Sequence, residues 1–444
     1  MQLTLKQIAD AVGGKANAFG EITGISTDTR TIQKGDLYIA LKGERFDGHD
    51  YIEKAFENGA AAVLSERECD KPCVLVKDTG VALLSLAEYY RTLFNTAVIG
   101  ITGSVGKTTT KEMVACVLES KYKTLKTKGN LNNQIGLPMT LFRLTADTQT
   151  AVIEMGMSGK GEISALSKTA KPDAAIITNI GYSHIEFFGS REAICEAKLE
   201  ILDGMADDAP LILNADDDLL DAFTDENRPL VFYGIDNPMC DVRGINLKEN
   251  GESTTFEILY GGENYIATIP TVGKHNVYDA LAAFSVGLIC SVPVSDIIEA
   301  LKNYVPSGMR QRIEKRGNAT VIIDCYNASP TSMQASLGVL GSREGRKIAV
   351  LGDMLELGEQ GKALHASLAD TAKENGIDIV LCLGEEMKNL KMRAKKIGLE
   401  CLHFDDKPTL SAYLKEHLAD GDNVLFKGSR GMALEEIIEE VWSK

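Results

Sequence analysis

Residues 97–111, AVIGITGSVGKTTTK, constrain this chain more than any other segment. A short apolar run leads into a glycine-bearing loop, and apolar residues at helical spacing follow it. At such a helix start, backbone N–H groups, a lysine ammonium and a threonine hydroxyl point to one place, which suits a nucleotide triphosphate and its metal ion. The glycines meet the strict phosphate-loop spacing only approximately, so an incidental glycine-rich turn is the alternative. The sequence predicts that the nucleotide phosphates contact Gly103, Ser104, Val105, Gly106, Lys107, Thr108 and Thr109.

Length and composition limit the class of protein. A chain of 444 residues predicts two or three domains, and a charged fraction of 25% is ordinary for a globular protein. The net charge of -16 argues against binding to nucleic acid or to anionic membranes. Nine cysteines at irregular spacing, with no Cys-x-x-Cys pair, favour reduced thiols in a cytoplasm over disulfides or zinc.

The apolar segments predict buried helices rather than membrane spans. Thr4 and Gln7 form a possible capping box for an amphipathic helix, which is not the pattern of a signal peptide. The longest apolar stretch, residues 280–294, is interrupted by polar, glycine and proline residues and is shorter than the roughly 20 residues that span a bilayer. We therefore expect no membrane insertion and a cytoplasmic location.

The order of apolar runs and turns predicts an α/β fold with three domains. Residues 1–95 mix short helices and strands, with a turn-rich centre at 42–49. Residues 96–307 form a central P-loop domain, whose parallel or mixed sheet has a small antiparallel subregion at about 240–270. A linker at 306–308 leads into residues 308–444, a C-terminal Rossmann-like α/β domain.

Polar residues at predicted strand ends are candidates for chemistry. Glu154 closes one strand and could supply an oxygen to a divalent cation, with a solvated strand end as the alternative. His184 lies in a polar loop after the next strand and is either a metal or phosphate contact or a structural histidine. Asp324 and Asn327 follow a strand of the third block, where an acidic residue suits ribose hydroxyls and a capped helix start is the alternative. An amide cluster also suggests a platform for a polar ligand; it comprises Asn130, Asn132, Asn133 and Gln134.

Taken together, these segments resemble the Mur ligases of bacterial cell-wall synthesis. The resemblance runs in order through nearly the whole chain: residues 26–30, the phosphate loop, and residues 129–138, 154–156, 179–186, 273–276, 324–330, 352–356 and 427–430. Residues 324–333 look like the Asn-Ala-Asn-Pro region of the branch that adds a dipeptide. The departures are modest: Thr29 stands where Ser is usual, Ser329 where a second Asn is usual, and Asp279 where an Asn is common.

The resemblance implies amide formation driven by ATP. In that family the tripeptide carboxylate of UDP-N-acetylmuramoyl-tripeptide attacks the γ-phosphate and becomes an acyl phosphate. The amino group of D-alanyl-D-alanine then attacks the acyl carbon, and phosphate leaves. The resemblance also implies Mg²⁺ as a cofactor and separate UDP-substrate, ATP and acceptor domains, and we expect a monomer.

Roles carry over by motif onto matching positions of this chain. Lys107, His184 and Lys198 would be catalytic, and Thr108, Glu154, His184 and, if it is carbamylated, Lys198 would serve magnesium. The alternative for Lys198 is an exposed helix lysine. Nucleotide contacts would come from Asn276, Arg310 and Asp324, and the UDP end would bind Ser26, Thr27, Asp28 and Arg30. Substrate contacts in the third block would come from Tyr326, Asn327, Lys427 and Ser429.

Two other functions remain open on the sequence. One is a sister amide ligase that adds a free amino acid, which acceptor profiling would distinguish. The other is a nucleotide-switched binding module, whose nucleotide turnover would not depend on a UDP-peptide.

Overall fold

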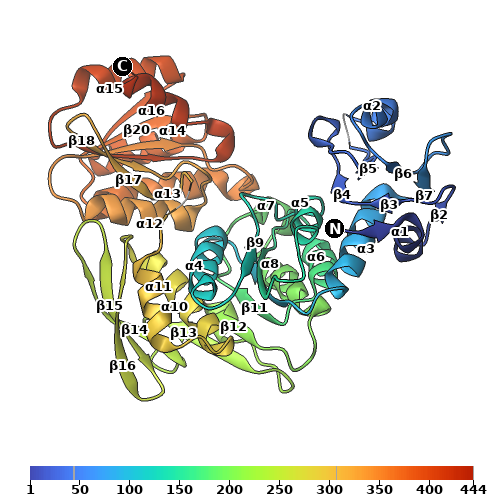
Figure 1. Ribbon diagram of the computed structural model, residues 1–444. Coiled ribbons are helices and arrows are strands. Elements are labelled where there is room, and N and C mark those ends of the chain that lie inside the picture. The colour runs from blue at the N-terminus through green and yellow to red at the C-terminus, as the bar shows by residue number, and fades with distance from the viewer. Residues whose placement is uncertain (44–45, 307, 444) are drawn as a thin grey trace.

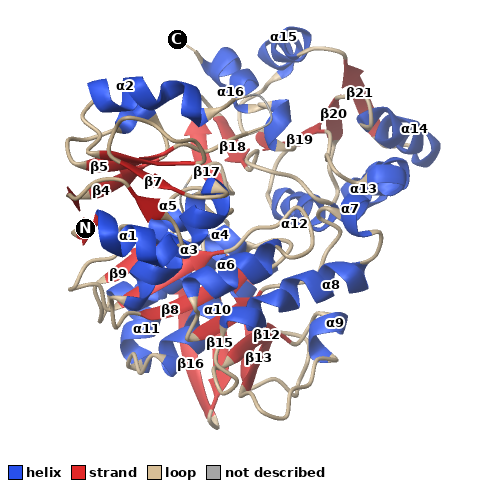
Figure 2. Cartoon of the chain, turned by 90° about the vertical axis from the view of Figure 1, so that its right-hand side faces the viewer, coloured by secondary structure: helices blue, strands red, loops and turns tan. Residues whose placement is uncertain are grey.

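The computed structural model describes residues 1–43, 46–306 and 308–443, whose strands form three large sheets in chain order. Figure 1 shows the first unit (blue) and the third unit (orange to red) on different sides of the central one, and Figure 2 gives the view at right angles. The expected turn at 42–49 and the expected linker at 306–308 each include residues outside the described ranges.

The first unit is a five-stranded sheet with the order β2-β7-β6-β5-β4. Its strands are parallel except for β2, which pairs antiparallel to β7, and a separate pair, β1 and β3, lies beside the first helix. The helix after β1 begins with the capping box of Thr4 and Gln7 predicted from the sequence. The elements are β1 (Leu3–Thr4), α1 (Leu5–Val12), β2 (Lys15–Ala16), β3 (Glu21–Ile22), β4 (Gly24–Ser26), β5 (Asp36–Ile39), α2 (Ile52–Glu57), β6 (Ala62–Ser65), β7 (Cys73–Leu75) and α3 (Thr79–Thr92).

The central unit is a nine-stranded sheet with the order β16-β15-β14-β13-β12-β11-β8-β10-β9. The strands from β9 to β14 are parallel, and β15 and β16 add the expected antiparallel part. Its strands are β8 (Ala97–Thr102), β9 (Thr124–Lys126), β10 (Thr150–Glu154), β11 (Ala174–Ile177), β12 (Leu211–Asn214), β13 (Leu230–Gly234), β14 (Val242–Glu249), β15 (Thr254–Tyr260) and β16 (Glu263–Ile269). Its helices are α4 (Lys107–Glu119), α5 (Gly136–Leu141), α6 (Glu162–Ala170), α7 (Ile185–Phe188), α8 (Arg191–Leu199), α9 (Asp218–Asp221), α10 (Lys274–Ile289) and α11 (Val294–Lys302).

The third unit is a six-stranded sheet with the order β17-β18-β22-β19-β20-β21, parallel except for the β17–β18 pair. Its strands are β17 (Arg312–Arg316), β18 (Ala319–Ile323), β19 (Lys347–Gly352), β20 (Ile379–Leu383), β21 (Glu400–Phe404) and β22 (Asn423–Lys427). Its helices are α12 (Pro330–Gly341), α13 (Gly361–Glu374), α14 (Met387–Ile397), α15 (Lys407–His417) and α16 (Glu435–Trp442).

Helices cover both faces of the central sheet, as its continuous apolar strands require. Along β8, Val98 packs into one core cluster, whereas Ile99 and Ile101 pack into the other. The second cluster contains residues of α4 and α10. Of the stretch 280–294 that we expected to be a buried helix, residues 280–289 form the last part of α10, whereas residues 290–293 lie outside a helix and α11 begins at Val294. On the other face α3 packs against α5 and α6, which joins the first unit to the central one.

The fold class predicted from the sequence is confirmed, because each apolar run that predicts a strand in the central and third domains contains a strand of a mostly parallel sheet. These runs are residues 97–102, 151–154, 174–179, 211–214, 321–324, 348–351, 379–382 and 424–427. All nine cysteines are free. Among the described residues, no helix is both long and apolar enough to cross a membrane.

Candidate active site

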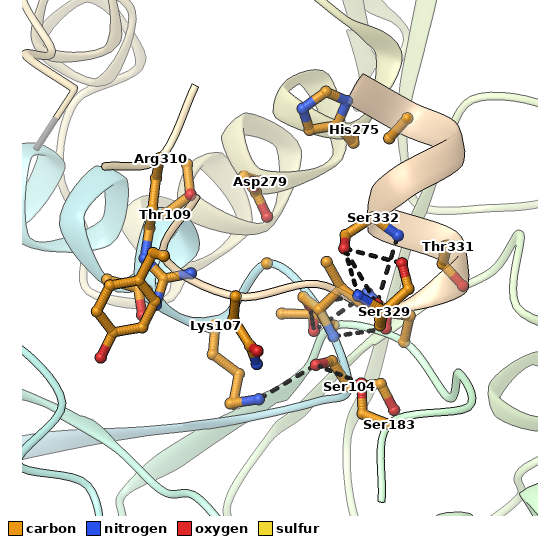
Figure 3. Close-up of a pocket in the computed structure, with 18 of the residues that line it drawn as sticks. Ser104, Lys107, Thr109, Ser183, His275, Asp279, Arg310, Ser329, Thr331 and Ser332 are labelled. Carbon is orange, nitrogen blue, oxygen red and sulfur yellow. Dashed lines mark hydrogen bonds between the residues drawn. The ribbon is translucent and has the colours of Figure 1, made fainter. Parts of the chain in front are cut away.

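A cavity of about 650 Å³ lies where the central and third units meet. Its lining residues fall between Ser104 and Lys427, and they come from loops at the carboxyl ends of strands in both sheets and from the first turns of α4, α10 and α12. Figure 3 shows Lys107 of the central unit with Arg310 and Ser329 of the third around this space. Carboxyl ends of parallel strands are where ligands bind in open α/β sheets, so the position agrees with the general rule.

The phosphate loop follows β8 and begins α4. Gly103 and Gly106 have φ of +146° and +87°, and a Cβ there would lie 1.9 Å from Thr178 Oγ1 and 2.8 Å from Asp279 Oδ1, respectively. Both positions therefore need glycine. The Lys107 ammonium donates hydrogen bonds to the carbonyl oxygens of Gly103 (2.7 Å) and Ser104 (3.3 Å), so it is held beside the loop it would serve. Figure 3 shows Lys107 next to Ser104.

Glu154 is the buried centre of a polar cluster behind the loop. Its Oε2 accepts a hydrogen bond from Thr108 Oγ1 at 3.0 Å, and its Oε1 accepts one from Asn132 Nδ2 at 2.8 Å. The side chain of Lys111 is fully buried, and its Nζ lies 3.8 Å from Glu154 Oε2. Glu154 is 2% exposed, so the alternative of a solvated strand end is wrong.

The oxygens of Thr108 and Glu154 would supply only part of the coordination shell of a hard cation. In the part of the chain that the structure describes, no three His, Cys, Asp or Glu side chains gather as a metal site. Thr108 and Glu154 nevertheless present adjoining oxygens, which are the ligand type that Mg²⁺ prefers. Mg²⁺ usually takes one or two protein oxygens together with substrate phosphates and waters, so the pair fits such a site.

His184 lies beside the cavity at the start of α7, with its Nδ1 2.5 Å from Glu356 Oε2 of the third unit. Burial lowers the pKa of its imidazole; the Glu356 charge opposes the shift, and Lys107 and Lys198 add to it. A neutral imidazole is the form that can accept a proton or bind a cation.

Lys198, near the end of α8, is 2% exposed, so the alternative of an exposed helix lysine is wrong. No hydrogen bond or ion pair from the described residues reaches its ammonium. Burial, and secondly the charge of Lys107, lower its pKa well below the ordinary value. Only the unprotonated amine reacts with CO₂, so a lowered pKa acts in the direction that carbamate formation requires.

The third unit contributes a charged pair and a stacked cation. The Lys427 ammonium lies 2.6 Å from Asp324 Oδ2, and it also donates to the carbonyl oxygen of Asn327 at 3.3 Å. The Arg310 guanidinium lies over the ring of Tyr326, 4.2 Å from its centroid. Ser329 caps α12 with a capping box, so the helix-start interpretation of this segment also holds.

Asn276 and Asp279 reach the cavity from α10. Asn276 Nδ2 donates to the carbonyl oxygen of Val272 at 2.7 Å, and Asp279 Oδ1 accepts from Thr110 Oγ1 at 2.6 Å. Burial raises the pKa of Asp279 to about 7, with Thr110 and Arg310 opposing the shift. The sequence marked Asp279 as a departure from the resembled family, but not as a site residue.

Replacing Asp279 with asparagine is expected to stabilise the protein above neutral pH. The folded state keeps a proton that the unfolded state releases above about pH 4, so the free energy of unfolding falls as the pH rises towards 7. Three pKa units correspond to about 4 kcal/mol, and relaxation around the carboxylate reduces this figure. We expect denaturant titration to show Asp279→Asn more stable than the parent by about 2 kcal/mol at about pH 8, with a much smaller difference at about pH 5.

The matched control is Asp296→Asn, on the exposed side of α11, which should change stability by less than about 0.5 kcal/mol at either pH. An Asp279→Asn effect that is the same at both pH values would contradict the assignment of a raised pKa.

Several residues predicted for the site lie outside the cavity lining. Arg30 is exposed in the first unit and forms an ion pair with Asp28 at 2.6 Å, and Asp28 caps a short 3₁₀ helix. Ser429 is buried, and its hydroxyl accepts a hydrogen bond from the Leu355 N–H at 2.9 Å. Gly103, Lys198, Gln134 and the Ser26–Asp28 turn also lie outside the lining.

Three residues near the site were missed by the sequence analysis. Lys111 carried no signal, because a lysine within a helix is ordinarily exposed. Gln311 donates to the carbonyl oxygen of Val272 at 2.8 Å and so ties the third unit to the segment that precedes α10. Glu356 ends the segment 352–356, which supported the resemblance but was given no role.

The phosphate loop, the buried Glu154 and a cavity lined by two α/β units are the arrangement of a P-loop enzyme. The chain matches the Mur ligase family, catalytic domain over residues 21–96, the Mur ligase middle domain over 101–287 and the Mur ligase, glutamate ligase domain over 310–430. The chain belongs to the Mur ligase family.

Individual relatives agree over the full length. The UDP-N-acetylmuramoyl-tripeptide–D-alanyl-D-alanine ligase of Bacillus subtilis is 43% identical, over 99% of this chain and 98% of the relative. A crystal structure of MurF from Acinetobacter baumannii has a TM-score of 0.93 at 32% identity, covering 100% of this chain and 99% of that one. The MurF ligase from Thermotoga maritima in complex with ADP has a TM-score of 0.86 at 31% identity, covering 94% of this chain and 96% of that one.

Proposed function

We propose that this protein is an ATP-dependent ligase that joins D-alanyl-D-alanine to UDP-N-acetylmuramoyl-tripeptide and releases ADP and phosphate. The observation that carries the proposal is the cavity between two α/β units, with a phosphate loop on one side and Arg310, Asp324 and Asn327 on the other. The full-length relative from Bacillus subtilis, 43% identical and named for this activity, supports it.

The first step brings two anions together. The terminal carboxylate of the tripeptide attacks the γ-phosphorus of ATP, the bond to the β,γ-bridging oxygen breaks, and ADP leaves. Lys107 is held beside the phosphate loop and would balance the charge of the transferring group. The chain contributes mainly orientation and fixed charge to this step.

One magnesium ion would be held by Thr108 and Glu154. A second would be held by His184 and, if it is carbamylated, by Lys198. Bound there, Mg²⁺ would reduce the repulsion between the phosphate oxygens and the incoming carboxylate. The lowered pKa of Lys198 supports the carbamate, and an ammonium at this position would repel a nearby cation.

The second step forms the amide. The free amine of D-alanyl-D-alanine attacks the acyl carbon, loses a proton, and the phosphate group leaves from the tetrahedral intermediate. Asn327, Tyr326 and Lys427 border the cavity on the third unit, where they would orient the dipeptide. Because the third unit closes the same cavity, docking would also exclude water that would hydrolyse the acyl phosphate.

The first unit would bind the UDP end of the substrate through the exposed turn that carries Arg30. We assign the three roles to domains at residues 1–95, 96–307 and 308–444. A cytoplasmic location, where ATP and reduced thiols are available, suits the nine free cysteines. We also propose that the protein is a monomer.

Product analysis tests the proposal. The protein is incubated with ATP, magnesium and UDP-N-acetylmuramoyl-tripeptide, with D-alanyl-D-alanine or single amino acids as acceptor. We expect a UDP-pentapeptide by mass spectrometry only with the dipeptide. A product from a single amino acid would identify a sister ligase, and nucleotide turnover that ignores both substrates would identify a switch; either result would overturn the proposal.

Replacing Arg310 with alanine is expected to raise the KM for ATP about tenfold, because a charge-assisted contact to phosphate contributes roughly 1.5 kcal/mol or more. The guanidinium is held over Tyr326, 4.2 Å from the ring centroid, and it borders the cavity. The control is Arg312→Ala, whose half-exposed side chain pairs with Glu314 in β17. An Arg310→Ala variant with parental kcat and KM would contradict a nucleotide site shared between the two units.

A further inference from the structure

Two loops from different units meet at His184 and Glu356. His184 precedes α7 in the central unit, and Glu356 follows β19 in the third. His184 Nδ1 lies 2.5 Å from Glu356 Oε2, and the Glu186 N–H faces the Glu356 carbonyl oxygen at 3.5 Å. A Cβ on Gly358 would lie 3.3 Å from Glu186 Cβ, so the two backbones also pack closely.

Both residues have a backbone conformation that side chains rarely adopt. The φ of His184 is +65° and that of Glu356 is +63°, in the left-handed region that favours glycine. Residues persist in this region only where the surroundings hold them, and such positions gather at functional sites. Here the two strained residues contact each other across the boundary between two units.

The loop that carries Glu356 is fixed within the third unit. The Leu355 N–H donates to Ser429 Oγ at 2.9 Å, and the Met354 N–H donates to His365 Nε2, also at 2.9 Å. Ser429 is 3% exposed and His365 is fully buried. Glu356 is therefore presented from a rigid support, and its position relative to His184 depends on how the two units dock.

The contact decides which nitrogen of His184 is available to the cavity. Nδ1 is buried against the Glu356 carboxylate, although the pair is not aligned as a full hydrogen bond. Nε2 has no partner among the described residues. A carboxylate beside Nδ1 favours the tautomer that carries its proton there, which leaves the lone pair on Nε2.

We propose that Glu356 is a positioning residue that the third unit supplies to His184, so that the imidazole is oriented for its role only when the two units are docked. The proposal rests on the ligase function proposed above, because it makes the phosphoryl-transfer site depend on arrival of the acceptor-binding unit. Nucleotide would then not be consumed efficiently before that unit is in place.

The first test determines the tautomer of His184 in the absence of substrate and metal. Nitrogen-15 NMR of the imidazoles of the full chain reports the tautomer of each of the six histidines, and His184→Gln identifies the His184 signal. We expect Nδ1 protonation in the parent and in the control Glu359→Ala, an exposed glutamate on the same segment. Glu356→Ala should shift the population towards Nε2 protonation. Spectra of Glu356→Ala identical to those of the parent would overturn the proposal.

The second test measures turnover as a function of magnesium concentration. Loss of a carboxylate that orients a histidine usually costs about 10- to 100-fold in metal affinity or activity. We expect Glu356→Ala to raise the half-saturating magnesium concentration or lower kcat by that factor, with the KM for D-alanyl-D-alanine changing less. Glu356→Gln, which keeps an acceptor oxygen, should recover most of the loss.

The two tests separate the two proposals. If the parent protein has no ligase activity, the proposed function is rejected. The NMR comparison then still tests whether Glu356 sets the tautomer of His184. An active parent with Glu356→Ala equal to Glu359→Ala in magnesium dependence and kcat would reject the role of Glu356 alone.

Discussion

Replacing Lys107 with methionine is expected to reduce turnover on the order of a thousandfold, the effect of removing a fixed charge from a transferring group. The ammonium is already held on the carbonyl oxygens of Gly103 and Ser104, so its charge is placed before substrate arrives. Methionine keeps the aliphatic stem and removes only the charged end. Steady-state phosphate release at saturating substrates measures the effect.

The stability of this variant should not fall with its activity. Burial lowers the pKa of Lys107, so its ammonium is destabilised in the folded protein and its removal relieves that cost. The control is Lys121→Met, just past the other end of α4, where the exposed ammonium donates a hydrogen bond to the carbonyl oxygen of Ser291. A Lys107→Met enzyme within tenfold of the parent kcat would contradict the role of the phosphate loop.

Replacing Lys198 with methionine is expected to lower turnover by on the order of a hundredfold or more while leaving the protein equally or more stable. A buried amine that has no hydrogen-bond or ion-pair partner among the described residues costs folding free energy, and a functional role would account for its retention at 2% exposure. The kcat from phosphate release and the free energy of unfolding from denaturant titration are measured on the same preparation.

The control for Lys198 is Lys168→Met on α6, whose side chain is exposed near Asp203. Carbon-13 NMR after labelling with bicarbonate would also show a carbamate signal in the parent and not in Lys198→Met. Full activity of Lys198→Met, or a large loss of stability with only a proportional loss of activity, would make Lys198 a structural residue.

Many strands of the large sheets could be predicted from the sequence, because a local run of apolar residues marks each of them. Apolar runs such as 174–177 and 211–214 became buried parallel strands, and Glu154 closes β10 as predicted. Short edge strands such as β2 and β9 were missed, because two or three residues carry too little periodicity and are fixed by their neighbours in the sheet.

The site residues that could be predicted are those that lie in or beside a recognisable sequence motif. Thr108, Lys107 and Asn132 lie in or beside motifs that predict phosphate or amide chemistry, and the structure brings them together with Glu154. Contacts between the central and third units could not be predicted, because no local sequence pattern marks them. The Glu356–His184 contact spans 172 positions (356 − 184), and it depends on the docking of two separate sheets.

In the proposed reaction, ATP cleavage and amide formation are coupled through an acyl phosphate in one cavity. Labelling both oxygens of the terminal carboxylate of UDP-N-acetylmuramoyl-tripeptide with oxygen-18 tests this coupling. We expect mass spectrometry of the released phosphate to find one label per molecule, and the new amide to keep the other. Unlabelled phosphate, with both labels retained in the peptide, would show that water or another group receives the γ-phosphoryl and would contradict an acyl phosphate.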